Sequence, residues 1–316
     1  MLLILTYSRD QTVDDLISLL PEIPIFRFNI DLWRNYEWEV NDIGFTILDP
    51  VGRRCEERST QAVYLRKLIF EPPFIDVPSG GNEEAWRREE LLQLFHAIRD
   101  LALASGKLAL VKPSMGASKI RQMRIARRWF PVPAWKAILS KNVQGFVAGT
   151  VVKTFGATPV GEGAHMLVRD VDVSRLSPEF PWFIQEKVLA THDVTVVYVN
   201  GHLFPFELKR DFEGADSRLA TALNNLEWPQ CEIAEDEAVG IRAMMSELGL
   251  TFGRFDFLRV DGRLWFLEVN PNGQWGWLDL RQSNGLYRAV ADEIRAVWKR
   301  NRLSGSGRSL ERETTQ

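Results

Sequence analysis

The sequence has 316 residues, of which 45% are hydrophobic and 26% are charged, so a sizeable core can form and global disorder is excluded. Its 39 basic and 42 acidic residues leave a net charge of -3, too small to indicate a partner such as nucleic acid or a membrane surface. Two cysteines and four histidines exclude a disulfide framework and a recognisable zinc site. The low cysteine count favours the cytosol, so we expect a cytoplasmic protein. No stretch reaches the roughly 20 apolar residues of a membrane span.

The first part of the chain, residues 1–105, reads as an open, Rossmann-like α/β domain. Its first strand-to-helix turn has no Gly-x-Gly-x-x-Gly motif, so we expect it to bind no dinucleotide. Arg66 stands near a strand end, where it is either a contact for an acidic peptide side chain or a surface salt bridge. The predicted elements are strands over 2–7, 25–28, 44–48 and 62–70 and helices over 12–20 and 82–105.

The remaining chain is predicted to form a central lobe, 106–190, a C-terminal lobe, 191–302, and a disordered tail, 303–316, which is poor in large apolar residues. A helix over 118–130 carries a basic face, which is usually solvated. The other predicted elements are strands over 146–154, 166–168, 182–188, 194–199 and 203–208, helices over 239–248 and 287–298, and a hairpin over 254–270.

The hairpin carries three polar residues, Asp256, Glu268 and Asn270, within otherwise apolar strands. A two-residue Asp-Gly loop would send Glu268 to the other face, whereas a three-residue loop over 260–262 places all three with Arg254 on one face and Asp256 diagonal to Glu268. Their oxygen donors suit Mg²⁺. An ion-pair network around Arg254 would also explain the residues, because a buried carboxylate needs a balancing cation. The residues alone leave both interpretations open.

The hairpin resembles the magnesium hairpin of the ATP-grasp superfamily, and Glu268-Val-Asn-Pro-Asn-Gly-Gln-Trp is similar to the string found in its ribosomal-peptide maturases, which cyclise graspetides such as microviridins. The resemblance covers roughly residues 110–300. It implies an ATP-grasp fold and an ADP-forming ligase that uses ATP and Mg²⁺. The implied partner is a precursor peptide with a leader and a core; no nucleic acid or membrane partner is implied, and a homodimer is left open.

The resemblance also implies roles for individual residues. Lys119 and Lys153 would reach the nucleotide phosphates, and a lysine in an apolar strand such as Lys153 is costly to bury without an anion. The remaining implied roles are adenine and ribose binding by Glu186, the Lys187 carbonyl, the Leu189 amide and Asp193, magnesium binding by Asp256, Glu268 and Asn270, and stabilisation of the anionic intermediate by Arg254 and Arg218.

Two features depart from the maturases. Thr195 stands where they commonly carry arginine, and Arg254 directly before the metal strand is similar to D-alanine-D-alanine ligases. Asp216-Ser-Arg218 and Gln274-Trp275 do resemble maturases. We therefore expect a ligase that activates a carboxylate as an acyl phosphate and forms ester or amide cross-links in a precursor peptide. The alternatives are a ligase joining a small amino acid to an amine and, more remotely, a non-catalytic nucleotide-binding module.

Overall fold

The computed structural model describes residues 1–66, 82–111, 118–139, 149–153, 155, 169–170, 179, 181–211 and 227–310. The chain divides into two compact units: unit 1 is Met1–Ser114 with Gln274–Gln316, and unit 2 is Met115–Gly273. Residues 274–302, which the sequence predicts as part of the hairpin lobe, belong to unit 1. Over the described ranges, no helix is both long and apolar enough to cross a membrane.

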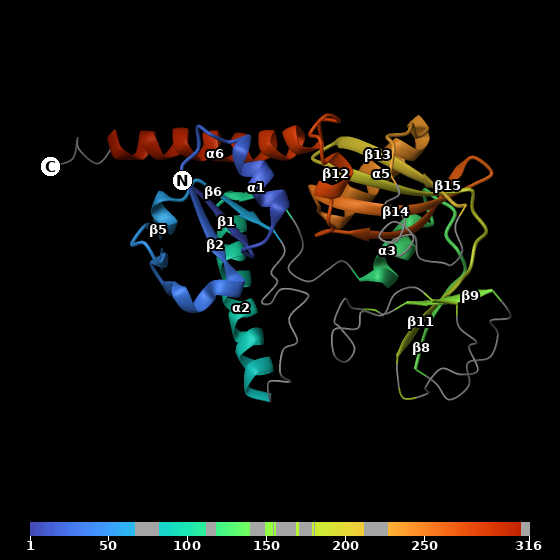
Figure 1. Cartoon of the computed structure of the whole chain (residues 1–316), viewed down its shortest axis with the longest axis horizontal. Helices are drawn as coiled ribbons and strands as arrows, with labels where there is room; N and C mark the ends of the chain where they lie inside the picture. Colours follow the sequence, from blue (N-terminus) through green and yellow to red (C-terminus); the bar gives the residue numbers. More distant parts are fainter. Residues whose placement is uncertain are drawn as a thin grey trace. The chain divides into compact units, whose positions relative to one another are not determined.

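Unit 1 is built on a parallel sheet with the strand order β2-β1-β6-β7 (Figure 1). A small antiparallel sheet, β3-β4-β5, follows β2, and its strands β3 and β5 were not predicted. The elements are strands β1 (Leu2–Thr6), β2 (Ile25–Asn29), β3 (Glu37–Asn41), β4 (Gly44–Leu48), β5 (Arg54–Glu56), β6 (Ala62–Leu65) and β7 (Leu108–Ala109), helices α1 (Gln11–Ser18), α2 (Asn82–Ala104) and α6 (Leu286–Leu310), and short 3-10 helices η1 (Ile30–Asn35), η2 (Glu57–Ser59) and η4 (Gly276–Asp279).

Helix α6 continues to Leu310, so the disorder predicted from residue 303 is wrong over 303–310. Its first turns are anchored by Leu286, Val290 and Ile294, all fully buried. Extending an existing helix costs little free energy, because each added residue forms one further hydrogen bond. The rest of the predicted tail, 311–316, lies outside the described residues.

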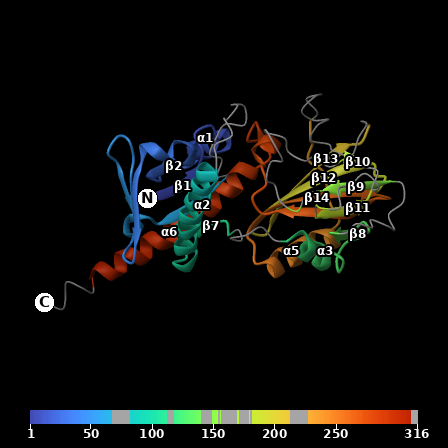
Figure 2. The ribbon, with the colours of Figure 1, turned by 90° about the horizontal axis from the view of Figure 1, so that it is seen from below.

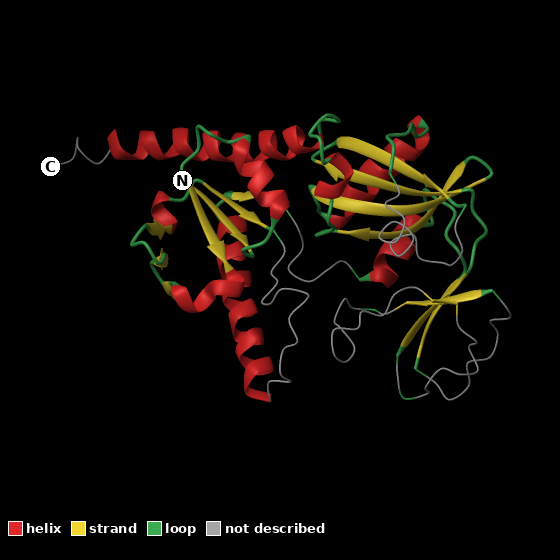
Figure 3. Cartoon of the chain, in the orientation of Figure 1, coloured by secondary structure: helices red, strands yellow, loops and turns green. Residues whose placement is uncertain are grey.

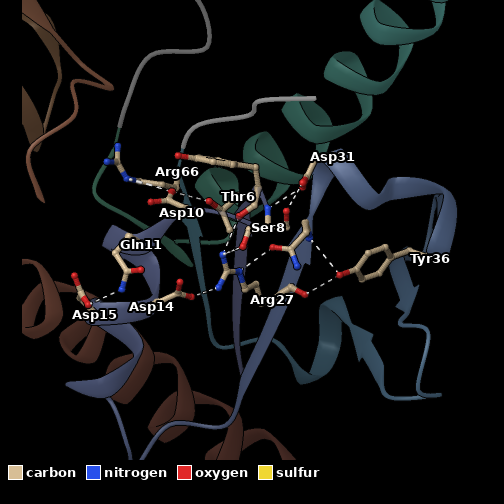
Figure 4. Close-up of polar contacts among 12 residues, drawn as sticks. Thr6, Ser8, Asp10, Gln11, Asp14, Asp15, Arg27, Asp31, Tyr36 and Arg66 are labelled. Carbon is tan, nitrogen blue, oxygen red and sulfur yellow. Dashed lines mark hydrogen bonds and ion pairs between the residues drawn. The ribbon is translucent and has the colours of Figure 1, made fainter. Parts of the chain in front are cut away.

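Polar side chains meet at the carboxyl ends of the parallel strands of unit 1 (Figure 4). The Thr6 hydroxyl donates to Asp10 Oδ2 at 2.8 Å, and Arg66 Nε lies 3.7 Å from the same oxygen. Arg66 is only 2% exposed, so the interpretation as a surface salt bridge is wrong: the pair with Asp10 is internal.

Unit 2 contains two four-stranded sheets, ordered β10-β9-β11-β8 and β13-β12-β14-β15 (Figure 3). Helices α3 and α5 cover one face of the second sheet (Figure 2), where Met244, Phe255 and Phe266 belong to one buried cluster. The elements are β8 (Trp135–Ile138), β9 (Thr150–Lys153), β10 (Arg169–Asp170), β11 (Trp182–Glu186), β12 (His192–Val199), β13 (His202–Lys209), β14 (Phe252–Val260), β15 (Arg263–Asn270), α3 (Lys119–Ala126) and α5 (Glu235–Leu248).

Candidate functional site

The β14–β15 hairpin turns through two residues, Asp261 and Gly262, because Val260 pairs directly with Arg263. Both turn residues have positive φ, 48° and 78°, as a type I′ turn requires. The expected three-residue loop is therefore wrong.

A β-bulge nevertheless brings the predicted residues onto one face. The register shifts between Asp256 and Phe257, which leaves Leu267 as an extra residue on β15. Asp256 then lies directly opposite Glu268, not diagonal to it, and Arg254 lies opposite Asn270. Opposite residues in an antiparallel pair share a face. The four polar side chains therefore lie on one face, as the sequence predicted, but a bulge and not a three-residue loop places them there.

Gly273, two residues after the proline of this motif, has a steric reason to be glycine. A Cβ placed there would lie 2.7 Å from Arg254 Cβ. The turn after β15 thus packs closely against Arg254.

Cations surround the two carboxylates. Arg254 Nη2 donates to Asp256 Oδ2 at 3.0 Å, and Lys119 Nζ lies 3.4 Å from Glu268 Oε2. Burial alone would raise the pKa of Glu268, but the charges of Lys119, Lys153 and Arg254 outweigh burial and hold that pKa below its usual value. The ionised carboxylate is therefore the stable form of Glu268.

Lys153 is the least accessible of these cations. It pairs with Phe183 across β9 and β11 and is 8% exposed. Lys119, Lys153 and Arg254 thus all act electrostatically on Glu268. A concentration of cations beside two carboxylates is the charge pattern that a polyphosphate bound together with a divalent cation requires.

The oxygen donors of the hairpin suit a Mg²⁺ ion that also binds water and phosphate, rather than a metal ion bound by protein side chains alone. In the part of the chain that the structure describes, no three His, Cys, Asp or Glu side chains form a metal-binding group. Asp256 and Glu268 supply carboxylates, and Asn270 is exposed with its Oδ1 accepting a hydrogen bond from the Asn272 amide at 3.0 Å. Mg²⁺ commonly takes one or two carboxylates and completes its shell with water and phosphate oxygens.

Two residues that the sequence analysis missed hold this hairpin. Thr195 of β12 is 2% exposed, and its Oγ1 lies 3.0 Å from the Phe255 carbonyl and 3.2 Å from Asp256 Oδ1. Gln122 of α3 donates to the Val269 carbonyl at 2.8 Å and accepts from the Val269 amide at 2.9 Å. No sequence signal marked Gln122, which stands within the basic helix; Thr195 was noted only as a departure from the maturases.

The predicted adenine-binding residues lie at the end of β11 and directly after it. The Glu186 side chain accepts a hydrogen bond from the Ala134 amide at 3.2 Å, and the Lys187 amide donates to the Gly149 carbonyl at 2.7 Å. Leu189 is 85% exposed and, among the described residues, makes no hydrogen bond.

Asp193 has a partner that was not predicted. Arg210 Nη1 lies 2.9 Å from both carboxylate oxygens of Asp193, so the predicted ribose contact would have to share this carboxylate with Arg210. Arg218 lies outside the described residues.

A hollow of about 440 Å³ is lined by residues of α3 and its flanks and by one residue of α5. Arg121, Arg124 and Arg128 line it together with Glu247 of α5. Arg128 forms an ion pair with Glu247, and Arg121 donates to the Glu247 carbonyl at 3.1 Å. Two arginines of this basic segment thus contact Glu247 of α5.

No protein-family model matches the chain, and no curated protein matches it significantly in sequence. Among solved structures, it is similar to an ATP-grasp ligase associated with a ribosomal peptide in Chryseobacterium gregarium, with a TM-score of 0.75 over 93% of this chain and 96% of that chain at 19% identity. The chain has the ATP-grasp fold.

Other ATP-grasp structures give the same result. Macrocyclase MdnC from Microcystis aeruginosa MRC matches with a TM-score of 0.73 over 93% of this chain and 99% of that chain at 20% identity. ATP-grasp ligase PsnB matches with a TM-score of 0.69 over 94% and 97% of the two chains at 17% identity. The predicted fold class is confirmed. Lys119, Lys153 and Arg254 all lie within unit 2.

Proposed function

We propose that this protein is an ADP-forming ligase that activates a carboxylate of a precursor peptide and joins it to a hydroxyl or amine of the same peptide. The observation that carries the proposal is the convergence of Lys119, Lys153 and Arg254 on the carboxylate pair Asp256 and Glu268. This arrangement binds a polyphosphate anion together with a hard divalent cation.

In the proposed reaction, a substrate carboxylate oxygen attacks the γ-phosphorus of ATP, and ADP leaves. The hydroxyl or amine then attacks the acyl carbon, loses its proton, and inorganic phosphate leaves. The net change in the peptide is the loss of one water for each cross-link. Catalysis of this kind consists mainly of positioning and charge neutralisation.

The residues of the chain would divide this work. Lys119 and Lys153 hold phosphate oxygens, and Lys153 does so from a buried strand position where its contact is strong. Arg254 steadies the anionic acyl phosphate and the tetrahedral oxyanion, a role that we extend to Arg218. Asp256, Glu268 and Asn270 hold Mg²⁺, which when bound neutralises phosphate charge. The Leu189 amide and Lys187 carbonyl read the adenine edge, beside Glu186, and Asp193 contacts the ribose.

The proposal of a peptide substrate is supported by the similar structures. The Chryseobacterium gregarium ligase is described in complex with ADP and a leader and core peptide, MdnC with its precursor peptide MdnA, and PsnB with a minimal precursor, Mg and ADP. We extend the same ligand classes to this chain: ATP, Mg²⁺ and a precursor peptide.

The test is to incubate the purified protein with ATP, Mg²⁺ and the peptide encoded by a small reading frame beside the gene, and to measure peptide mass and ADP. We expect ADP formation and a peptide mass lowered by one or more waters. ADP formation with small amino acids and an amine, but not with the peptide, would favour the amino-acid ligase instead. Nucleotide binding without ADP formation under any condition would favour the non-catalytic module.

A further inference from the structure

We propose that Thr195 is a positioning residue that fixes the carboxylate of Asp256 for metal binding. Each oxygen of this carboxylate has its own protein partner: Oδ1 lies 3.2 Å from the Thr195 hydroxyl, and Oδ2 lies 3.0 Å from Arg254 Nη2. Two contacts on different oxygens fix the plane of the carboxylate, because rotation about its last bond would break both.

The backbone register supports this assignment. Thr195 of β12 lies directly opposite Asp256 of β14, so the two side chains share a face of the sheet. The hydroxyl has a single proton, which the Phe255 carbonyl at 3.0 Å and the carboxylate at 3.2 Å can both accept. A charged acceptor makes the stronger hydrogen bond.

Packing alone does not account for a threonine at this position. Its neighbours on β12, Val194, Val196 and Val197, are buried valines, and valine has the shape of threonine without the hydroxyl. A buried hydroxyl costs free energy unless it is hydrogen-bonded. The hydroxyl of Thr195 is therefore explained by its contacts with the Phe255 carbonyl and the Asp256 carboxylate.

The proposal rests on the proposed function, in which Asp256 is a magnesium ligand. Hydrogen bonds from outer residues orient metal ligands, and their loss typically weakens metal affinity or activity about 10- to 100-fold. Thr195 would act only through Asp256. Its removal should therefore change the response to Mg²⁺ and leave the binding of nucleotide without metal unchanged.

The experiment measures ADP binding by calorimetry for the wild type, Thr195→Val and Thr195→Ser, first with a chelator and then over a series of Mg²⁺ concentrations. The quantity compared is the Mg²⁺ concentration that gives half of the metal-dependent gain in ADP affinity. We expect it to rise about 10- to 100-fold in Thr195→Val and to stay near the wild-type value in Thr195→Ser. ADP affinity in chelator should be the same in all three.

Thr60→Val provides a matched control. Thr60 is a buried threonine of unit 1 whose hydroxyl donates to the Glu56 carbonyl at 2.8 Å, so this variant also loses a buried hydroxyl. It should leave the Mg²⁺ response unchanged. If Thr195→Val does not fold, Thr195→Ala and Thr195→Ser replace it, because they differ from each other by the hydroxyl alone.

The outcomes separate the two proposals. A wild-type Mg²⁺ response in the variants without a hydroxyl would overturn the role of Thr195 and leave the proposed function standing. A wild type whose ADP affinity does not depend on Mg²⁺ would overturn both, because Asp256 would then hold no metal.

Discussion

The side-chain amide of Gln122 pairs with both backbone groups of Val269, as a neighbouring strand would. Gln122 lies one helical turn after Lys119, and Val269 stands between Glu268 and Asn270. A single side chain therefore fixes the helix that carries one phosphate-binding candidate against the strand that carries two metal-binding candidates.

Gln122→Ala should lower the free energy of unfolding by about 2 to 4 kcal/mol, because it leaves a buried amide and carbonyl of Val269 without partners. Urea denaturation gives the measurement. Gln93→Ala is the control, since Gln93 is exposed on α2 and its side chain donates to Glu89 at 2.8 Å; it should cost less than about 0.5 kcal/mol. Equal stability of the two variants would show that the Val269 contact contributes nothing.

Lys153→Ala and Lys119→Ala should each weaken ADP binding about 10- to 100-fold, because each removes a charge-assisted contact with phosphate. Calorimetry with Mg²⁺ present measures the affinities. Lys136→Ala removes an exposed lysine of β8 and should bind ADP like the wild type. Unchanged affinity in both site variants would remove these lysines from the nucleotide site.

Asp256→Asn should change the stability of the ligand-free protein by only about 1 kcal/mol, because its ion pair with Arg254 is partly exposed, 28% at the aspartate. The wild type should gain thermal stability when Mg²⁺ and ADP are added together, by mass action, and the variant should gain far less. A variant that is strongly destabilised without ligands yet gains as much as the wild type would show a purely structural ion pair.

Arg66→Ala should destabilise the protein by about 3 kcal/mol or more, because it leaves Asp10 buried without its cation. Thermal or urea unfolding measures the loss. Arg58→Ala removes an arginine that is 85% exposed in its pair with Glu56 and should be nearly neutral. A neutral Arg66→Ala would contradict the internal role of this pair.

The Cys55 thiol should make stability fall at high pH. Burial raises its pKa to about 11, against the opposing effect of the hydrogen bond with Thr60. The folded state keeps the proton that the unfolded chain releases above about pH 9, so the free energy of unfolding falls between pH 9 and 11, by up to about 1.4 kcal/mol per pH unit. Urea unfolding over this range should show a smaller decline in Cys55→Ala. If the free energy of unfolding fell equally with pH in the wild type and in Cys55→Ala, the decline would not come from Cys55.

The sequence predicted the polar face of the hairpin but not how it forms. Asp261-Gly262 indicated a turn, and the identities of Asp256 and Glu268 indicated a shared task. The bulge at Leu267 shifts the alternation, so that Leu264 and Phe266 are buried and the next buried residue is Val269. The sequence hides this shift because Trp265 and Leu267 are apolar as well.

Long-range partners were missed for a related reason. Gln122 is 147 residues from Val269, and Arg210 is 17 residues from Asp193. Their residue types are ordinary on a helix or at a strand end, and only the tertiary packing shows what they bind. Strands β1, β2, β4, β11, β12 and β13 were predicted because a run of apolar residues, continuous or alternating, is a local signal.

Strand β15 stands at the edge of its sheet, yet the partners of its outward amides come from three separate segments. The amide of Leu264 donates to Glu237 Oε1 at 2.8 Å, that of Phe266 to the Pro131 carbonyl at 2.9 Å, and that of Val269 to Gln122. Because these amides already have partners, a strand of another chain cannot pair with this edge. Self-association by strand addition is thus blocked along β15, where a run of apolar residues would otherwise promote it.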